Sequence, residues 1–270
     1  MKRKLCYDLF MPEKAFLILF SCKGENCRKE EIVVHQSWKD HKRKAVTFSY
    51  DDGVVHDVRL VELLNQYHLK CTFNLNSEVL GYCFFLKDEN HRIAHYRVRP
   101  EHVRELYEGH EVAVHTLTHP NLTQLDEAEI IRQVEEDRKN LEDLVGYDVV
   151  GMAYPCGGVN NDDRVASIIR QHTKIKYCRT TTCTGSFDIQ EDLYKFNPTA
   201  YHIADWDQLM ELGRKFVEMQ PDSPQIFYVW GHSYEMDLDS SYWAKLEEFF
   251  KLISNHDDIF YGTNAEILLG

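Results

Sequence analysis

Two short groups of polar residues have the types and spacing of a metal site. Asp51 and Asp52 lie together in the sequence D-D-G, which is typical of a turn. His115 and His119 are four positions apart in H-T-L-T-H. If the intervening residues make a helical turn, both imidazoles lie on one face and can reach a single ion. One aspartate would complete a set of two histidines and one carboxylate. Zinc hydrolases use this set with a position left for water, and iron(II) oxygenases use a similar one.

The second aspartate of the pair is difficult to explain without a bound cation, because adjacent carboxylates repel each other. One carboxylate can bind the metal while the other accepts a proton from metal-bound water, whose pKa falls to about 7 on zinc. Standing alone, D-D-G is typical of an ordinary turn, and H-x-x-x-H is a weak signal. Their occurrence together, each directly after a predicted strand, favours a catalytic site.

Strands and helices alternate along the part of the chain that must position these residues. Strands are predicted from apolar, β-branched and aromatic runs at 45–50, 71–76, 111–115, 149–154, 176–180, 226–232 and 259–261. Helices are predicted from apolar residues at helical spacing at 58–67, 102–109, 125–146, 162–172, 207–219 and 242–254. The alternation predicts an α/β fold, a distorted (β/α) barrel of about seven parallel strands in a single domain. Residues 78–99 are predicted to form a loop or lid.

The chemistry of such barrels lies on the loops that follow the carboxyl ends of the strands. D-D-G follows the first predicted strand, and H-T-L-T-H follows the third. Y-P-C-G-G at 154–158 closes the fourth strand, and W-G-H at 230–232 closes a late one. These four segments are therefore expected to meet at one end of the barrel.

Composition and charge exclude several classes of protein. The 270 residues carry a net charge of −13, and such an acidic surface disfavours nucleic-acid binding, which needs clustered Lys and Arg. A neutral or cationic substrate is easier to accept. No apolar run reaches the roughly 18 residues that a membrane-spanning helix needs. No feature of the sequence indicates an oligomeric state.

Residues 1–43 are predicted to be an N-terminal extension that precedes a catalytic domain at 44–270. The eight cysteines lack a regular spacing, which favours free thiols and a reducing, cytoplasmic compartment. The apolar stretch at 15–20, followed by Cys22, also looks like the end of a lipoprotein export signal, but it is shorter than the roughly 7–15 residues usual there. The extension is therefore expected to be irregular or a degenerate export signal. Export with a lipid anchor on Cys22 is the alternative location.

Together these motifs resemble the polysaccharide deacetylase family, carbohydrate esterase family four, over residues 44–268. The family's T-F-D-D-G motif is met by S-Y-D-D-G, which implies that Asp51 is the catalytic base and Asp52 a metal ligand. Its H-[ST]-x-x-H motif is met by H-T-L-T-H, which gives His115 and His119 the other two ligand positions. The resemblance implies a divalent metal, with Zn²⁺ expected and Co²⁺, Ni²⁺ or Mn²⁺ as alternatives.

The third family motif, usually R-x-P-Y-G, is only partly present. In the family its arginine pairs with the base, but this chain has A-Y-P-C-G, with Ala153 at that position. The oxyanion-stabilising role falls to the backbone N–H of Cys156, because a backbone donor does not depend on the side chain. Arg179, after a later predicted strand, is a candidate substitute for the missing arginine. Cys156 could also be a nucleophile or a fourth ligand, although the motif makes no demand on a thiol.

A late histidine completes the resemblance. His232 in V-W-G-H-S matches the family's general acid. Asp205 and Trp206 resemble a further motif, with the aspartate tuning that histidine and the tryptophan lining the site; a helix N-cap and core packing are their alternative roles. Tyr154 is another candidate for the substrate-binding wall. All other histidines, including those at positions 95 and 202, are interpreted as surface or packing residues.

The resemblance therefore predicts a metal-dependent deacetylase that hydrolyses an acetyl group, N-acetyl in preference to O-acetyl, on a sugar or oligosaccharide. Metal-activated water would attack the carbonyl, with the Asp51 base and the His232 acid moving the protons. One alternative is hydrolysis of a small non-sugar amide on the same fold. Another is a catalytically inactive carbohydrate-binding module, which the intact acid and base argue against.

Overall fold

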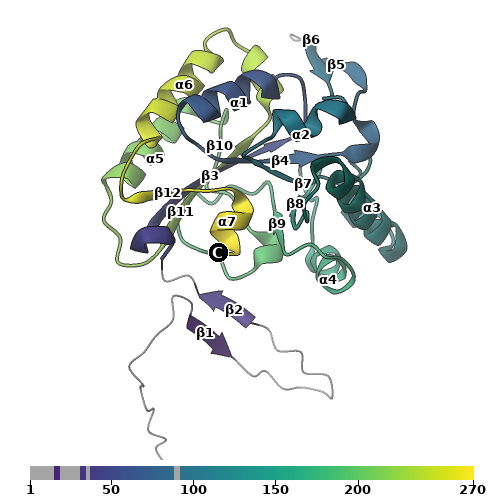
Figure 1. Ribbon diagram of the computed structural model, residues 1–270, viewed down its shortest axis with the longest axis horizontal. Helices are drawn as coiled ribbons and strands as arrows, with labels where there is room; N and C mark the ends of the chain where they lie inside the picture. Colours follow the sequence, from purple (N-terminus) through teal and green to yellow (C-terminus); the bar gives the residue numbers. More distant parts are fainter. Residues whose placement is uncertain (1–14, 19–30, 35–36, 88–91) are drawn as a thin grey trace, which may run out of the picture.

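A curled sheet of parallel strands forms the centre of the fold (Figure 1). The computed structural model describes residues 15–18, 31–34, 37–87 and 92–270. Along the sheet the strands follow the order β10 (Ala200–Tyr201), β11 (Gln225–Gly231), β3 (Lys44–Asp51), β4 (Cys71–Leu75), β7 (Glu111–Val114), β8 (Gly151–Ala153) and β9 (Tyr177–Arg179). Each neighbouring pair is parallel. The predicted α/β class is confirmed.

Strand β3 lies in the middle of this order and fixes the position of the first polar group. Its eight residues are all buried, as expected for a parallel strand covered on both faces. Strand β11 pairs with it from Lys44 to Tyr50. The opposite edge is shared by β12 (Ile259–Tyr261) near the amino end and by β4 near the carboxyl end. Asp51 is therefore held at the end of a strand that has partners on both sides.

A short segment between β9 and β11 brings the two ends of the sheet together. Phe196 forms a parallel bridge with Arg179 of β9, and its amide donates to the Cys178 carbonyl at 3.0 Å. Four residues later, Ala200 of β10 pairs with Val229 of β11. The predicted distorted barrel is confirmed, and its closure depends on a two-residue strand that is too short to show a sequence period.

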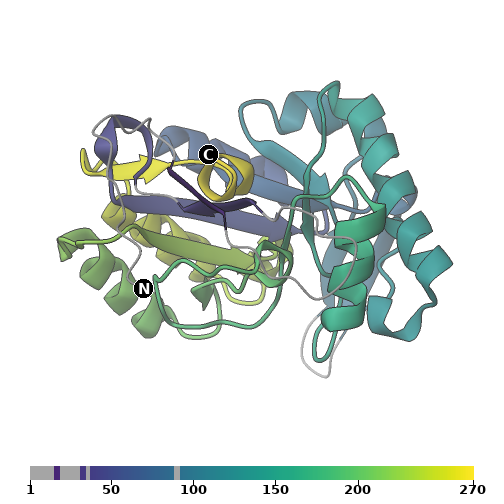
Figure 2. The same ribbon diagram turned by 90° about the horizontal axis from the view of Figure 1, so that it is seen from below.

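Helices cover the outside of the sheet in two groups (Figures 1 and 2). On one side lie α1 (Asp57–Gln66), α5 (Trp206–Glu218) and α6 (Tyr242–Ile253), and on the other lie α2 (Val103–Leu106), α3 (Glu127–Val145) and α4 (Asp163–His172). Helix α3 begins where the Asp126 carboxylate accepts from the Glu129 amide, and it ends at Gly146, whose φ is 83°. All six predicted helices are confirmed.

The prediction of an irregular loop at 78–99 is wrong, because ten of these residues form an antiparallel hairpin, and the alternative of a lid stays a prediction. Strand β5 (Cys83–Lys87) pairs with β6 (Arg92–Tyr96), and residues 88–91 between them lie outside the described residues. Beyond the hairpin, the Val98 amide donates to the Gly53 carbonyl at 2.8 Å, which attaches this segment to the D-D-G turn. Residues 83–86 of β5 form a continuous apolar run with no alternation, so no strand period marked them.

Two further strands precede the barrel in the sequence. β1 (Ala15–Ile18) and β2 (Glu31–Val34) form a separate antiparallel pair. Trp38 is buried, and its indole N–H donates to the Ile267 carbonyl at 3.1 Å. Cys22 lies outside the described residues, so lipid anchoring and the boundary at residue 43 stay predictions. The five cysteines of the described residues are free. Among the helices described, none is long and apolar enough to cross a membrane.

The C-terminal helix α7 (Asn264–Leu268) closes the amino-terminal end of the barrel around a buried carboxylate. Glu111, the first residue of β7, accepts hydrogen bonds from the Thr72 hydroxyl at 2.7 Å and the Tyr177 hydroxyl at 2.9 Å. The Ala265 amide in the first turn of α7 donates to it at 3.0 Å. Because buried donors need an acceptor, this one carboxylate ties β4, β9 and α7 together.

We predict that Glu111→Ala destabilises the fold by roughly 2–4 kcal/mol, because two buried hydroxyls and a part-buried amide lose their acceptor at once. The free energy of unfolding is measured by urea titration with circular dichroism. Glu108→Ala, which removes an exposed carboxylate three residues away, is the control and should leave the value unchanged. A loss no larger than that of the control would show that this end of the barrel does not depend on the carboxylate.

Candidate active site

The polar segments predicted to follow strand ends meet at one end of the barrel. Asp51 ends β3, the histidine pair follows β7, and Cys156 and His232 follow β8 and β11. All of them border one cavity of about 460 Å³, together with Asp52. The prediction that the carboxyl ends of the strands gather these residues is confirmed.

Asp52, His115 and His119 offer ligand atoms that all lie within 4.8 Å of one another. Oδ1 of Asp52 is 4.0 Å from Nε2 of His115 and 3.7 Å from Nε2 of His119. This oxygen is buried and accepts no hydrogen bond from the described residues. Nδ1 of His115 lies 2.9 Å from the Ala153 carbonyl, which selects the tautomer with a lone pair on Nε2. In geometry and donor type the three residues fit a divalent cation.

Strained backbone conformations hold these side chains in place. Asp52, Thr116, His119 and Cys156 have φ values between 64° and 84°, a region that costs non-glycine residues energy. The residues between the two histidines do not make a helical turn. Left-handed residues at 116 and 119 bend the chain instead, and the imidazole ring centroids lie 4.9 Å apart. Such clustering of strained residues around one cavity is typical of functional sites.

Asp51 is paired with Arg179, whose Nη2 lies 2.6 and 2.5 Å from the two carboxylate oxygens. The Asn74 side chain donates to the same carboxylate at 2.8 Å. Arg179 is fully buried, and its guanidinium lies 4.6 Å from the Trp230 ring centroid. Ala153, where the arginine of the motif is missing, is the register partner of Arg179 on the neighbouring strand. The candidate substitute therefore reaches Asp51 from one strand further along the sheet.

His232 lies on another side of Asp51, with its Nε2 3.9 Å from the carboxylate. Its Nδ1 is 3.1 Å from Oε1 of Glu235. Burial alone lowers the pKa of His232, but the charges of Glu235 and the two aspartates outweigh it and raise the pKa to about 9. The other Glu235 oxygen lies 2.8 Å from Nε2 of His202, and the Tyr50 hydroxyl lies 3.0 Å from Nδ1 of that histidine. A buried network thus orients the predicted acid.

The predicted tuning role of Asp205 is wrong, because Glu235 is the carboxylate beside His232. Asp205 is exposed and caps α5, where it accepts a backbone hydrogen bond at 3.0 Å. The predicted lining role of Trp206 is also wrong, since its ring packs near Tyr242 and does not border the cavity. Both residues take their alternative roles of helix cap and packing.

The Y-P-C segment contributes more backbone than side chain to the site. Tyr154 borders the cavity but is fully buried, and its hydroxyl donates to the Tyr194 carbonyl at 2.8 Å, so its predicted role in binding substrate is not supported. The Asn160 side chain donates to the Cys156 carbonyl at 2.7 Å and holds the loop. Burial, with a smaller contribution from Asp52, raises the pKa of the Cys156 thiol, which disfavours a nucleophilic thiolate.

Two side chains that sequence reasoning missed contact Asp52 directly. His95 Nε2 lies 3.1 Å from Oδ2, and Arg97 Nη2 lies 3.1 Å from Oδ1. Burial by itself raises the pKa of Asp52, but the His95 hydrogen bond and the Arg97 charge hold it well below its ordinary value. Glu235 and His202 were missed as well. One signal was available, because Glu235 lies three residues after the predicted acid. The alternation of His95 and Arg97 does not relate them to Asp52.

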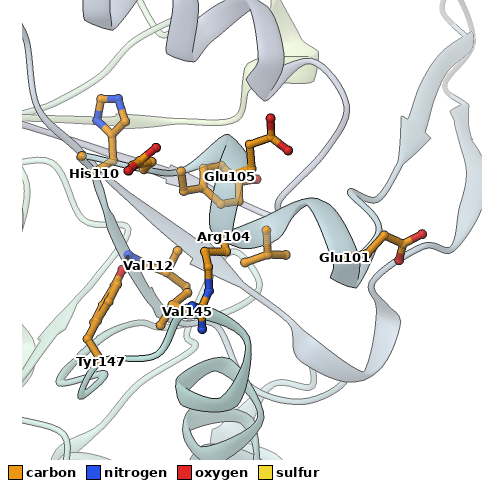
Figure 3. A pocket seen from close by; sticks show the side chains of 11 residues that line it. Glu101, Arg104, Glu105, His110, Val112, Val145 and Tyr147 are labelled. Atoms are coloured by element: carbon orange, nitrogen blue, oxygen red, sulfur yellow. Dashed lines mark hydrogen bonds between the residues drawn. The ribbon is translucent and has the colours of Figure 1, made fainter.

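A second cavity, of about 580 Å³, lies near the amino end of β7 (Figure 3). Glu101, Arg104, Glu105 and Tyr147 are among the residues of its wall. The Arg104 side chain there donates to the Leu144 carbonyl at 3.0 Å. None of the residues predicted to carry chemistry borders this cavity. The cavity at the carboxyl ends of the strands is therefore the candidate active site.

Known deacetylases resemble this chain in sequence. The family model described as polysaccharide deacetylase matches residues 39–173, half of the chain. Peptidoglycan-N-acetylglucosamine deacetylase PgdA from Listeria monocytogenes is 33% identical over 125 residues, which cover 45% of this chain and 23% of that protein. Chitin deacetylase 1 from Cryptococcus neoformans is 29% identical over 188 residues, 68% of this chain and 34% of that protein. The chain thus spans about a quarter to a third of the length of these curated relatives.

Two solved structures share the fold at low sequence identity. The family 4 carbohydrate esterase from Streptomyces lividans has a TM-score of 0.52 and 14% identity, with 84% of this chain and 95% of that chain covered. The Xyl-CE4 domain of a multidomain xylanase from the hindgut metagenome of Trinervitermes trinervoides has a TM-score of 0.52 and 15% identity, with 84% and 90% covered. The barrel is common to all three chains, and the family model matches half of this sequence. The chain therefore belongs to the polysaccharide deacetylase family.

Proposed function

We propose that this chain is a metal-dependent hydrolase that removes acetyl groups, N-acetyl in preference to O-acetyl, from a sugar or oligosaccharide. The observation that carries the proposal is the arrangement around Asp51, whose Oδ2 lies 3.9 Å both from Nε2 of His115 and from Nε2 of His232. A carboxylate between a metal set and a protonated imidazole supplies the parts that amide hydrolysis needs. The relatives named as peptidoglycan and chitin deacetylases support an N-acetylated sugar as substrate.

Asp52, His115 and His119 would hold the metal. Zn²⁺ suits two imidazoles and one carboxylate, and Co²⁺, Ni²⁺ or Mn²⁺ are alternatives. When bound, such an ion supplies a Lewis acid for the acetyl carbonyl and for a water molecule. Because His115 Nδ1 is directed at the Ala153 carbonyl, its Nε2 is available for the ion. Asp52 Oδ1 accepts no hydrogen bond from the described residues and has only the Arg97 ion pair at 3.1 Å.

Asp51 would act as the general base. Arg179 offsets its charge, and Asn74 fixes the orientation of its carboxylate. Asp51 takes a proton from the attacking water, so that the oxygen closes on the carbonyl carbon. Its guanidinium partner is buried and packs against Trp230, which holds the carboxylate beside the ligand set.

Two donors would complete the reaction. The Cys156 backbone N–H stabilises the oxyanion of the tetrahedral intermediate, and Asn160 holds its loop in advance, which avoids reorganisation during the reaction. His232 gives its proton to the leaving nitrogen as the carbon–nitrogen bond breaks, which releases acetate and a free amine. Glu235 keeps this imidazole protonated across the neutral range.

Aromatic side chains would form the wall that receives the substrate. Tyr201 stacks on Trp230 with ring centroids 4.5 Å apart, and the Tyr234 ring lies 5.1 Å from that of His232. All of them border the cavity. Apolar faces with a few placed polar groups are typical of ligand-binding cavities. We expect a sugar ring to lie against these side chains.

A second candidate function is hydrolysis of a small non-sugar amide. The hairpin favours it, because Phe84 and Leu86 of β5 border the cavity and give it an additional wall. Rates of product release from N-acetylglucosamine oligomers and from small ureides and formamides separate the two functions. Faster turnover of the small amides would identify them, and not the sugar, as the substrate. The proposed metal site would be unaffected by that result.

We predict that Asp51→Asn lowers kcat by about 10²-fold or more, because an amide cannot take the water proton. Its metal content should match that of the wild type, since Asp51 is outside the ligand set. His115→Ala should instead lose the metal. Acetate release from an N-acetylglucosamine oligomer gives the rate, and plasma mass spectrometry gives the metal content. Undiminished activity of Asp51→Asn would rule out this base.

We predict that Glu235→Gln moves the alkaline limb of the kcat profile to lower pH. The Glu235 carboxylate helps to raise the pKa of His232 to about 9, so the protonated acid is present below that pH and lost above it. Without this charge the effect of burial is opposed less, the pKa falls, and activity ends at a lower pH. Asp205→Asn is the matched control and should leave the limb in place. An unmoved limb in Glu235→Gln would contradict the pairing.

We predict that Arg179→Ala lowers kcat/KM by about tenfold or more, because Asp51 is left buried without its partner. Adding Ala153→Arg to that variant should recover part of the loss, since position 153 is the register partner of position 179. Both variants are compared by acetate release after circular dichroism has verified folding. Equal activity of the wild type and Arg179→Ala would show that the base needs no cation.

A further inference from the structure

The β5–β6 hairpin is locked in register to the turn that carries Asp52. The Val55 amide donates to the Tyr96 carbonyl and the Val98 amide to the Gly53 carbonyl, both at 2.8 Å. In the turn, these bonds involve the residues one and three positions after Asp52. The end of β6 therefore cannot shift relative to the carboxylate without breaking backbone hydrogen bonds.

His95, near the end of β6, contacts one oxygen of that carboxylate, Oδ2. Its Nε2 lies 3.1 Å from Oδ2 of Asp52, and both side chains are buried. Oδ1, the second oxygen, is the one that faces the imidazoles of His115 and His119. A hydrogen bond on Oδ2 prevents the carboxylate from rotating about its last bond, so that Oδ1 stays directed at the metal position.

Two aromatic neighbours pack against the His95 ring. Phe84, its cross-strand partner, stacks on it with ring centroids 4.5 Å apart. The Tyr234 ring lies 4.8 Å away on an edge-to-face contact. Nδ1 of His95 has no hydrogen-bond partner among the described residues, and Nε2 faces the carboxylate. A carboxylate only accepts hydrogen bonds, so the ring must carry its proton on Nε2.

Arg97 anchors the same segment without taking over this role. Its Nη1 donates to the Asp52 backbone carbonyl and to Oδ1 of Asn76, the latter at 3.0 Å. This guanidinium holds the end of the hairpin against the main chain of the turn. Arg97 Nη2 also lies 3.1 Å from Oδ1, the carboxylate oxygen that faces the two histidines, whereas the contact on Oδ2 comes from His95.

We infer that His95 is a positioning residue for the metal-binding carboxylate. The hairpin thus supports the metal centre in addition to forming part of the cavity wall. The inference rests on the proposed metal site. His95 donates Nε2–H to Oδ2, which keeps Oδ1 directed at the ion. Phe84, which stacks on His95, borders the cavity, and its side chain is 42% exposed. Loss of such an outer partner typically weakens metal affinity by about 10–100-fold.

Two substitutions separate the hydrogen bond from the packing. His95→Phe keeps an aromatic ring between Phe84 and Tyr234 but removes the donor. His95→Gln keeps an N–H at a similar reach but removes the ring. Phe85→Ala is the matched control, because Phe85 is on the same hairpin but packs on Tyr96 and Arg92, away from Asp52.

The measurement is the zinc dissociation constant of each metal-free variant, obtained by competition with a chromogenic chelator, together with thermal unfolding. We expect His95→Phe to weaken zinc binding by about 10–100-fold, and His95→Gln and Phe85→Ala to stay within a few-fold of the wild type. A wild-type constant for His95→Phe would overturn the inference. Equal weakening in all three variants would also overturn it, because the effect would then belong to hairpin stability.

These outcomes are distinct from failure of the proposed function. Wild-type protein that binds no zinc, or binding that survives His115→Ala, would remove the metal site itself. Zinc binding that depends on His115 but is indifferent to His95→Phe would leave the metal site standing and remove only the positioning role.

Discussion

Two carboxylates side by side at the end of β3 impose the main constraint on this structure. Adjacent negative charges out of water repel each other and lose hydration, so each needs a counter-charge close by. Arg179 meets Asp51 from β9, and Arg97 meets Asp52 from the end of the hairpin. Both guanidiniums are buried, and both belong to segments far from the turn in the sequence. The barrel must close and the hairpin must dock before the two aspartates can be buried without a large penalty.

The same pairing sets the electrostatics of the cavity. Asp51 and Asp52 are matched by two arginines, and Glu235 is matched by His232, so the described side chains of the site nearly balance before an ion binds. A divalent ion would then add positive charge that no side chain offsets. Such a site favours species that develop negative charge, such as an oxyanion or a released acetate, even though the whole chain carries a charge of −13.

Sequence reasoning succeeded where a feature is local. Long periodic runs predicted the barrel helices, and fixed spacing within short loops predicted that the D-D-G turn and the histidine pair would meet. It failed where a contact joins distant segments. Nothing in the spacing of Arg97 or His95 relates them to Asp52, because register between the hairpin and the turn is set by backbone hydrogen bonds. Arg179 could be named only as a candidate, since strand order decides which residue reaches Asp51. Asp205 was misassigned because a short D-W match suits a helix cap equally well.

The position of Arg179 affects how catalytic competence is judged from a sequence alignment. Ala153 and Arg179 are opposite each other on adjacent parallel strands, and the guanidinium from the second strand reaches the end of β3. A comparison of position 153 alone would class this chain as lacking the arginine of the motif. The guanidinium is nevertheless present beside Asp51, because Arg179 supplies it. In this barrel the buried charge beside Asp51 comes from the strand next to the one that the motif predicts. The spatial neighbours of a buried carboxylate, and not a single alignment column, therefore decide whether its counter-charge is present.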